Sequence, residues 1–244
     1  MARLCLTVEY DGTCYGGWQV QPNATTVQQC VEDALAQVVG HPLRIYSSGR
    51  TDAGVHALAM QAHFDVETLL PLPAYREGVN RFLPEDIAIR EVRQVPDDFH
   101  ARFDAQGKWY RYRIYQGPVR SPLHRLNSWH INSSLDVAAM CQAAEYLVGE
   151  HDFAAFQATG CAATTTCRTV FSVDVGCHDG QLLIDVRGSG FLKNMVRIMV
   201  GTLVDVGRGR LAPDQVGTIL TGKQRCEAGL TAPAQGLCLM DVWY

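Results

Sequence analysis

Residues 4–10 read Leu-Cys-Leu-Thr-Val-Glu-Tyr, and the alternation in this stretch decides how the chain begins to fold. Leu4, Leu6, Val8 and Tyr10 share one face, while the residues between them share the other. This period of two predicts a half-buried strand.

The residues that follow predict an α+β unit. Beyond a glycine-rich loop, Thr26 and Gln29 form a capping box, and apolar residues continue at helical spacing to a stop at Gly40. Strands are expected at about 43–48 and 58–66, a short helix near 74–81 and a strand at 87–93. The order is β-α-β-β-α-β.

The second half of the chain predicts the same order. We expect a strand over 108–115, a helix capped by Ser133 or Ser134 that ends at Gly149, and strands at 168–177 and 180–187. His178-Asp179-Gly180 joins the last two as a hairpin. Helices at 191–206 and 213–221 and a strand at 237–242 complete it. The repeated order predicts two ferredoxin-like (RRM-like) α+β halves around one site, 1–100 and 101–244, which join near 96–107.

Bulk composition is that of a globular protein. The chain has 244 residues, of which 47% are apolar and 19% charged, so it can bury a core as one large or two small domains. Its net charge of −4 argues weakly against a nucleic-acid partner. Net charge is a sum, however, and a basic groove can lie on an acidic body.

Cysteine usage and the N-terminus indicate a soluble cytoplasmic protein. The nine cysteines include no CxxC pair, which predicts small buried side chains in a reducing compartment and no zinc site. The first residues enter a strand pattern directly, so no signal peptide is expected. No apolar run approaches the ~18–20 residues of a membrane span. The absence of P-loop, GxGxxG, HExxH and GxSxG motifs predicts chemistry without cofactor or metal.

The densest polar motif is Ser-Gly-Arg-Thr-Asp-Ala-Gly-Val-His-Ala over residues 48–57. Asp52 stands two residues before Gly54, which is typical of a turn or a helix cap. Catalysis is the alternative, because Arg50 can keep a carboxylate ionised or hold a phosphate, and the small neighbours leave the backbone open to a ligand. His56 adds a further polar group.

Two other segments interleave cations with apolar residues. In 108–115, Tyr110 shares a face with Tyr112 while arginines share the other, which fits either base stacking with phosphate attraction or an aromatic core under a solvated basic face. In the helix from 191, Arg197 lies on a polar stripe with Lys193, Asn194 and Gly201. One interpretation is that this stripe is the solvent-exposed side of the helix. The alternative is that Arg197 pairs with a carboxylate, and Asp52 is the candidate.

The motif at residues 49–57 resembles that of the tRNA pseudouridine synthase A family. Further matches in family order include Tyr-Asp-Gly at 10–12, Gly-Trp-Gln at 17–19, residues 96–103, 108–114 and 195–201, and Gly-Leu at 236–237. The resemblance therefore spans essentially the whole chain. It departs at Gly16, where the family commonly has a bulkier residue.

The resemblance implies a role for each matched residue. Asp52 would be the catalytic aspartate, and Arg50 would help to hold the flipped nucleotide. Tyr110 would stack on the target base, Arg197 would pair with the aspartate, and Leu237 would line the pocket.

It also implies a fold and an activity. The two halves would share a continuous, mostly antiparallel sheet with a central cleft, in a homodimer. The reaction would be the isomerisation of uridine to pseudouridine at positions 38, 39 and 40 of the tRNA anticodon stem-loop, without a cofactor. A non-catalytic RNA-binding module is the alternative, and a carboxylate-dependent nucleoside hydrolase is a further rival.

Overall fold

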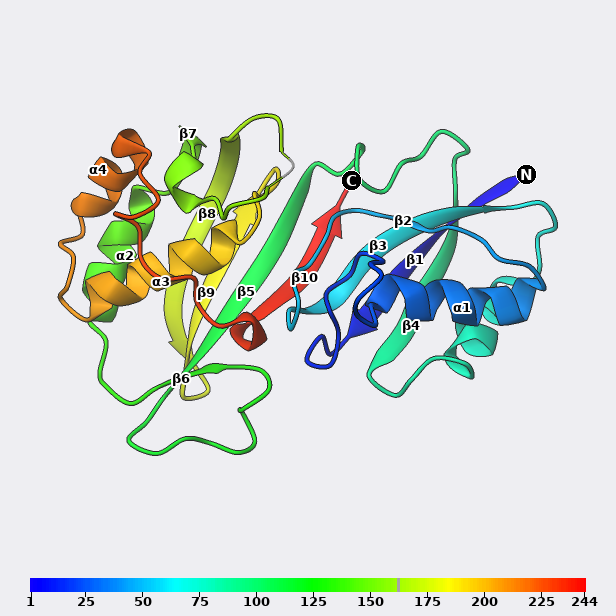
Figure 1. Ribbon diagram of the computed structural model, residues 1–244, viewed down its shortest axis with the longest axis horizontal. Helices are drawn as coiled ribbons and strands as arrows, with labels where there is room; N and C mark the ends of the chain where they lie inside the picture. The colour runs from blue at the N-terminus through cyan, green and yellow to red at the C-terminus, as the bar shows by residue number, and fades with distance from the viewer. Residues whose placement is uncertain (162) are drawn as a thin grey trace. The chain divides into compact units, whose positions relative to one another are not determined.

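The computed structural model describes residues 1–161 and 163–244, in which ten strands form one mostly antiparallel sheet with helices (Figure 1). The predicted mixed α+β class is confirmed. The strands are β1 (Ala2–Tyr10), β2 (Tyr46–Ser47), β3 (His56–Val66), β4 (Ile87–Val95), β5 (Gly107–Gln116), β6 (Trp129–Ile131), β7 (Gly149–Asp152), β8 (Cys167–His178), β9 (Gln181–Gly188) and β10 (Leu237–Trp243). The α-helices are α1 (Val27–Val39), α2 (Val137–Glu145), α3 (Met195–Gly207) and α4 (Gln215–Gly222).

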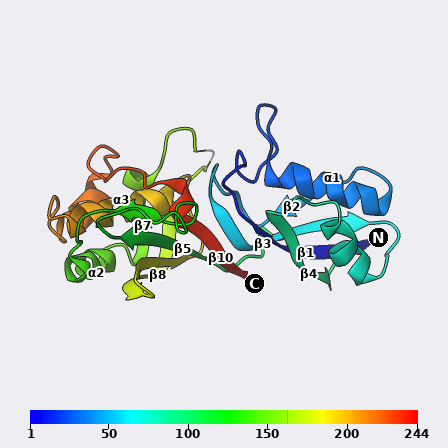
Figure 2. The same ribbon diagram turned by 90° about the horizontal axis from the view of Figure 1, so that it is seen from below.

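The chain divides into two compact units, the first of which joins residues far apart in sequence. It comprises Met1–Gln106 together with Leu239–Tyr244. Strands β4, β1 and β3 lie in that order, and β2 pairs with β3. Figure 2 shows α1 along one face of these strands. As predicted, Thr26 Oγ1 accepts a hydrogen bond from the Gln29 amide at 3.4 Å, and Gly40 ends the helix in the left-handed conformation.

The second unit, Gly107–Cys238, orders its strands as β5, β9, β8 and β7. β6 pairs with β5 in parallel. Asp179 and Gly180 join β8 to β9 with φ values of 50° and 73°. Two left-handed residues suit a tight hairpin because their twist matches that of the strands, so the predicted hairpin is confirmed.

Two helix starts differ from the prediction. Asp136, rather than Ser133 or Ser134, caps α2, and its carboxylate accepts a hydrogen bond from the Ala139 amide at 2.9 Å. The third helix begins at Met195 instead of 191 because Asn194 has φ 60°, which a right-handed helix excludes.

The cysteines also differ from the prediction. Cys5 and Cys238 are buried as expected, whereas five others are exposed: Cys14, Cys141, Cys167, Cys177 and Cys226. All nine are free thiols. No helix within the described residues is long and apolar enough to cross a membrane.

Candidate active site

Asp52 lies in the loop that connects β2 to β3. The Ser48 amide donates to the Gln61 carbonyl at 2.7 Å where the loop leaves the strand pair. Further on, the Val55 amide donates to the Asp52 carbonyl at 3.1 Å, and Gly54 between them has φ 78°. Asp52 therefore begins a tight turn, as its spacing from glycine predicted, and its side chain is half-buried.

The segment after β1 supports this turn from behind. The Trp18 amide donates to the Thr51 carbonyl at 3.1 Å, and the hydroxyls of Tyr10 and Thr51 lie 2.8 Å apart. A Cβ on Gly17, whose φ is 97°, would stand only 2.6 Å from the Thr51 carbonyl oxygen. Only glycine allows this approach, so the Gly-Trp segment sets the backbone position of Asp52.

Gly16 is also closely surrounded by neighbouring side chains. A Cβ there would stand 2.6 Å from the Ala24 Cβ and 2.6 Å from Gln21 Nε2. A larger residue at this position would require Gln21 and Ala24 to shift.

A chain of side-chain hydrogen bonds orients Arg50. Its Nε donates to Gln19 Oε1 at 3.1 Å, and Gln19 Nε2 donates to Gln28 Oε1 at 2.9 Å. Gln28 is buried on α1 and donates in turn to Glu32 Oε1 at 2.8 Å and to the Ile45 carbonyl at 3.2 Å. Arg50 itself is exposed. The hydrogen bond from this network involves only Nε of Arg50. It therefore orients the guanidinium, while the two terminal nitrogens of Arg50 remain available to an anion.

His56 is buried and serves the backbone. Its Nδ1 accepts a hydrogen bond from the Gly12 amide at 3.0 Å and lies 3.1 Å from Asp11 Oδ1. This geometry assigns His56 a structural part in holding the loop beneath Gly12.

Tyr110 and Arg111 point to opposite faces of β5, as predicted. Tyr110 is only 8% exposed, and its ring meets Phe191 edge to face with 5.3 Å between centroids. On the other face, Arg111 makes a two-pronged ion pair with Asp185, with both distances 2.9 Å. The basic face is therefore partly neutralised across the sheet.

Arg197 lies in the first turn of α3, where backbone groups fix it. Its Nε donates to the Ala232 carbonyl at 2.7 Å, its Nη1 donates to Asn194 Oδ1 at 3.1 Å, and its own carbonyl accepts from the Ala232 amide at 3.1 Å. Leu237 is buried at the start of β10. The first unit thus holds Arg50 and Asp52, and the second holds the other three candidates. The pairing of Asp52 with Arg197 stays a prediction.

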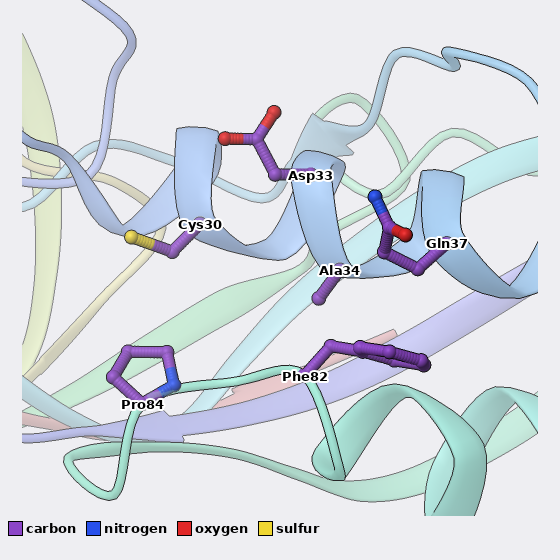
Figure 3. A pocket seen from close by; sticks show the side chains of 6 residues that line it. All are labelled: Cys30, Asp33, Ala34, Gln37, Phe82 and Pro84. Atoms are coloured by element: carbon purple, nitrogen blue, oxygen red, sulfur yellow. The ribbon is translucent and has the colours of Figure 1, made fainter.

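A pocket of about 320 Å³ lies between α1 and residues 82–84, and none of the five candidates lines it (Figure 3). Figure 3 shows the Asp33 carboxylate turned away from the Phe82 ring. The lining residues are Cys30, Asp33, Ala34, Gln37, Phe82 and Pro84. In the described part of the chain, no group of three or more His, Cys, Asp and Glu side chains could hold a metal.

Comparison of the whole chain with known proteins identifies its class. The family model described as "tRNA pseudouridine synthase" matches residues 6–104 and 143–244, so the chain is a pseudouridine synthase, an isomerase. The tRNA pseudouridine synthase A of Syntrophotalea carbinolica is 62% identical over 244 residues, with 100% of this chain and 97% of that protein covered. Those of Pelobacter propionicus and Geotalea uraniireducens are 56% and 54% identical, with both chains fully covered. The chain belongs to the tRNA pseudouridine synthase A family.

Proposed function

We propose that this chain isomerises uridine to pseudouridine at positions 38, 39 and 40 of the tRNA anticodon stem-loop, with Asp52 as the catalytic carboxylate. Family membership over the full length carries the proposal. The local structure supports Asp52, because a carboxylate on a tight turn with glycines behind it is held in place and open to a ligand in front.

The reaction needs one ionised carboxylate and a closed pocket. The C1′–N1 bond of uridine breaks, the uracil turns, a C1′–C5 bond forms, and the proton lost from C5 is balanced by one gained at N1. Attack on the base, attack at C1′ and abstraction of a sugar proton all require the anionic form of Asp52. The detached uracil must stay beside the sugar, since confinement supplies the high effective concentration that favours religation.

The remaining candidates assist the flipped nucleotide in this proposal. Arg50 binds the backbone phosphate beside the target, and Tyr110 replaces part of the stacking that the base loses when it leaves the helix. Phe191 supports this role because its ring packs perpendicular to the Tyr110 ring and limits the rotation of that ring. Arg197 favours the ionised form of Asp52, and Leu237 lines the pocket with apolar surface.

The test is turnover on an unmodified tRNA transcript. We expect the wild-type protein to form pseudouridine, detected by base-specific chemical labelling and primer extension, without release of uracil. Asp52→Asn keeps the side-chain volume but removes the charge, so the rate should fall by more than about 10³-fold while tRNA binding persists. Full turnover in that variant contradicts the assignment of Asp52.

The same experiment separates the rival functions. A non-catalytic RNA-binding module would bind the transcript and leave every uridine unchanged. A nucleoside hydrolase would release free uracil and leave an abasic site. Pseudouridine formation with no change in RNA mass excludes both.

The proposal includes a homodimer in the cytoplasm, with one tRNA in contact with both subunits. Sedimentation at micromolar concentration should give the mass of two chains. A monomer that retains full activity would refute the dimer and leave the role of Asp52 untouched.

A further inference from the structure

The charge of the chain is unevenly distributed around β5. Residues 105–135 form the longest stretch without Asp or Glu, in a chain with 25 acidic residues and a net charge of −4. Only three of the 21 cations in the chain are lysines, and arginine is the side chain that binds phosphate in a bidentate manner. The stretch holds five of these cations: Lys108, Arg111, Arg113, Arg120 and Arg125.

Two of the five lie in the loop of residues 117–128, which we call the β5–β6 loop. Unlike Arg111, which is paired with Asp185, neither Arg120 nor Arg125 meets a carboxylate within the described residues. Both are exposed, and Arg125 donates only to the Pro122 carbonyl, at 2.9 Å. The loop therefore presents positive charge that the protein does not use internally.

Contacts through His124 tie the β5–β6 loop to the neighbouring strands β5 and β9. The Ser128 hydroxyl donates to the His124 carbonyl at 2.8 Å, and a 3.0 Å hydrogen bond joins His124 Nδ1 to Gln181 Nε2 on β9. The His124 ring also lies 5.4 Å from that of Tyr115 on β5. Figure 1 shows the loop as the long green segment that leaves β5 and returns at β6. An ordered loop presents its side chains at a low entropic cost of binding.

Apolar side chains accompany the two arginines. Val119 is 69% exposed and Leu123 is 87% exposed, so both side chains are accessible to a ligand of the loop. Arginines without acidic neighbours favour a polyanionic ligand, and the apolar side chains beside them can contact ribose and base edges. A single RNA strand or stem offers both surfaces.

We propose that the β5–β6 loop binds the sugar–phosphate backbone of tRNA outside the reacting nucleotide, with Arg120 and Arg125 on phosphates. This inference rests on the proposed function, since it takes tRNA as the substrate. The loop serves affinity and not the chemical step. Removal of the two arginine side chains should therefore weaken tRNA binding and leave the rate at saturating tRNA unchanged.

The experiment compares two variants that lose the same charge. Arg120→Ala with Arg125→Ala is set against Arg76→Ala with Arg81→Ala, two exposed arginines of the first unit. For the loop variant we expect KM for full-length tRNA to rise roughly tenfold, kcat to stay within about twofold, and the slope of log K against log salt to flatten by about 2. The Arg120→Lys, Arg125→Lys variant should recover most of the slope.

Each outcome decides one question. Equal slopes and KM values for the loop and control variants overturn the inference. A loss of dimer in the loop variant with an unchanged salt slope also overturns it, because the loop would then face another protein chain. A wild-type protein that binds tRNA with the expected slope but forms no pseudouridine contradicts the proposed function and not the loop assignment.

Discussion

At the scale of single residues, Gln19 is the side chain that orients Arg50. Since Gln19 receives the Arg50 Nε–H and is itself held by Gln28, loss of its side chain should free the guanidinium without touching substrate. We expect Gln19→Ala to raise KM for tRNA about fivefold, the value of one hydrogen bond, with little change in kcat.

A double-mutant cycle distinguishes this positioning role from a structural one. In an Arg50→Ala background, Gln19→Ala should have no further effect on KM, because the group that it positions is gone. Additive effects of the two substitutions would show that Gln19 acts by some route other than Arg50. Thermal unfolding of each variant controls for a general loss of stability.

His63 makes the stability of the first unit depend on pH. It is 3% exposed, its Nδ1 accepts a hydrogen bond from the Ala101 amide at 3.2 Å, and its ring lies 4.6 Å from that of His100. Burial lowers its pKa from 6.5 to about 4, and the charges of His100 and Arg3 act in the same direction. The folded state therefore favours the neutral ring.

The sign of the pH dependence follows from that shift. Below pH 6.5, His63 takes up a proton in the unfolded chain but stays neutral in the folded chain. Its contribution to the free energy of unfolding is therefore fully present above pH 6.5 and is lost as the pH falls toward about 4. His63→Gln keeps an acceptor for Ala101 but cannot titrate. Its unfolding midpoint should decline less steeply than the wild-type midpoint between these pH values, and parallel declines would contradict the role of His63.

At the scale of elements, the sequence signals that succeeded were strictly local ones. Thr26 and Gly40 predicted both ends of α1 because each pairs with a backbone group of the adjacent turn. The side chain of Gln29, the other member of the predicted capping box, donates to Asp33 Oδ1. The start of α3 was missed because the left-handed Asn194 is stabilised by its contact with Arg197, which apolar periodicity does not reveal. Strands β6 and β7, of three and four residues, were also missed, since alternation needs a longer run to be visible.

Gly201 shows how packing can override helix propensity. The sequence placed it on the wet stripe of α3, yet it is buried, and an added Cβ would stand 1.8 Å from the Leu230 carbonyl oxygen. An exposed Gly→Ala change inside a helix gains about 1 kcal/mol. Here we expect Gly201→Ala to cost about 2 kcal/mol, as in overpacked cores, and to lower the unfolding midpoint by roughly 4–8 °C.

Gly217 in α4 supplies the matched control. Its added Cβ would meet the Tyr146 ring at 2.9 Å, and that ring is partly exposed and can turn aside. Gly217→Ala should therefore be neutral or slightly stabilising. If both substitutions stabilise the protein, the Leu230 carbonyl does not constrain α3.

At the scale of the whole molecule, one short motif predicted the catalytic candidate but not its support. The Gly-Arg-Thr-Asp-Ala-Gly run identifies Asp52 and Arg50. The residues that hold them, Gly17 and Gln28, lie more than 20 residues earlier in the chain. Long-range contacts of this kind leave no spacing in the sequence. The division into functional halves at residue 100 stays a prediction.

The last six residues of the chain belong to the first unit, and this contiguity in space predicts how the molecule responds to truncation. The Tyr244 hydroxyl donates to the Ala101 carbonyl at 2.8 Å, its ring lies 4.9 Å from that of Phe99, and the Gln106 amide donates to the Trp243 carbonyl at 3.0 Å. Without residues 239–244, the unit loses a strand beside β3 and the cover for residues 99–106. Amide hydrogen exchange should then accelerate in β1 and β3 far more than in β8 and β9, whereas Tyr244→Phe, which removes only one hydrogen bond, should cost about 1 kcal/mol. Uniform acceleration across both units would mean that the chain unfolds as one cooperative body and that its C-terminus does not serve the first unit alone.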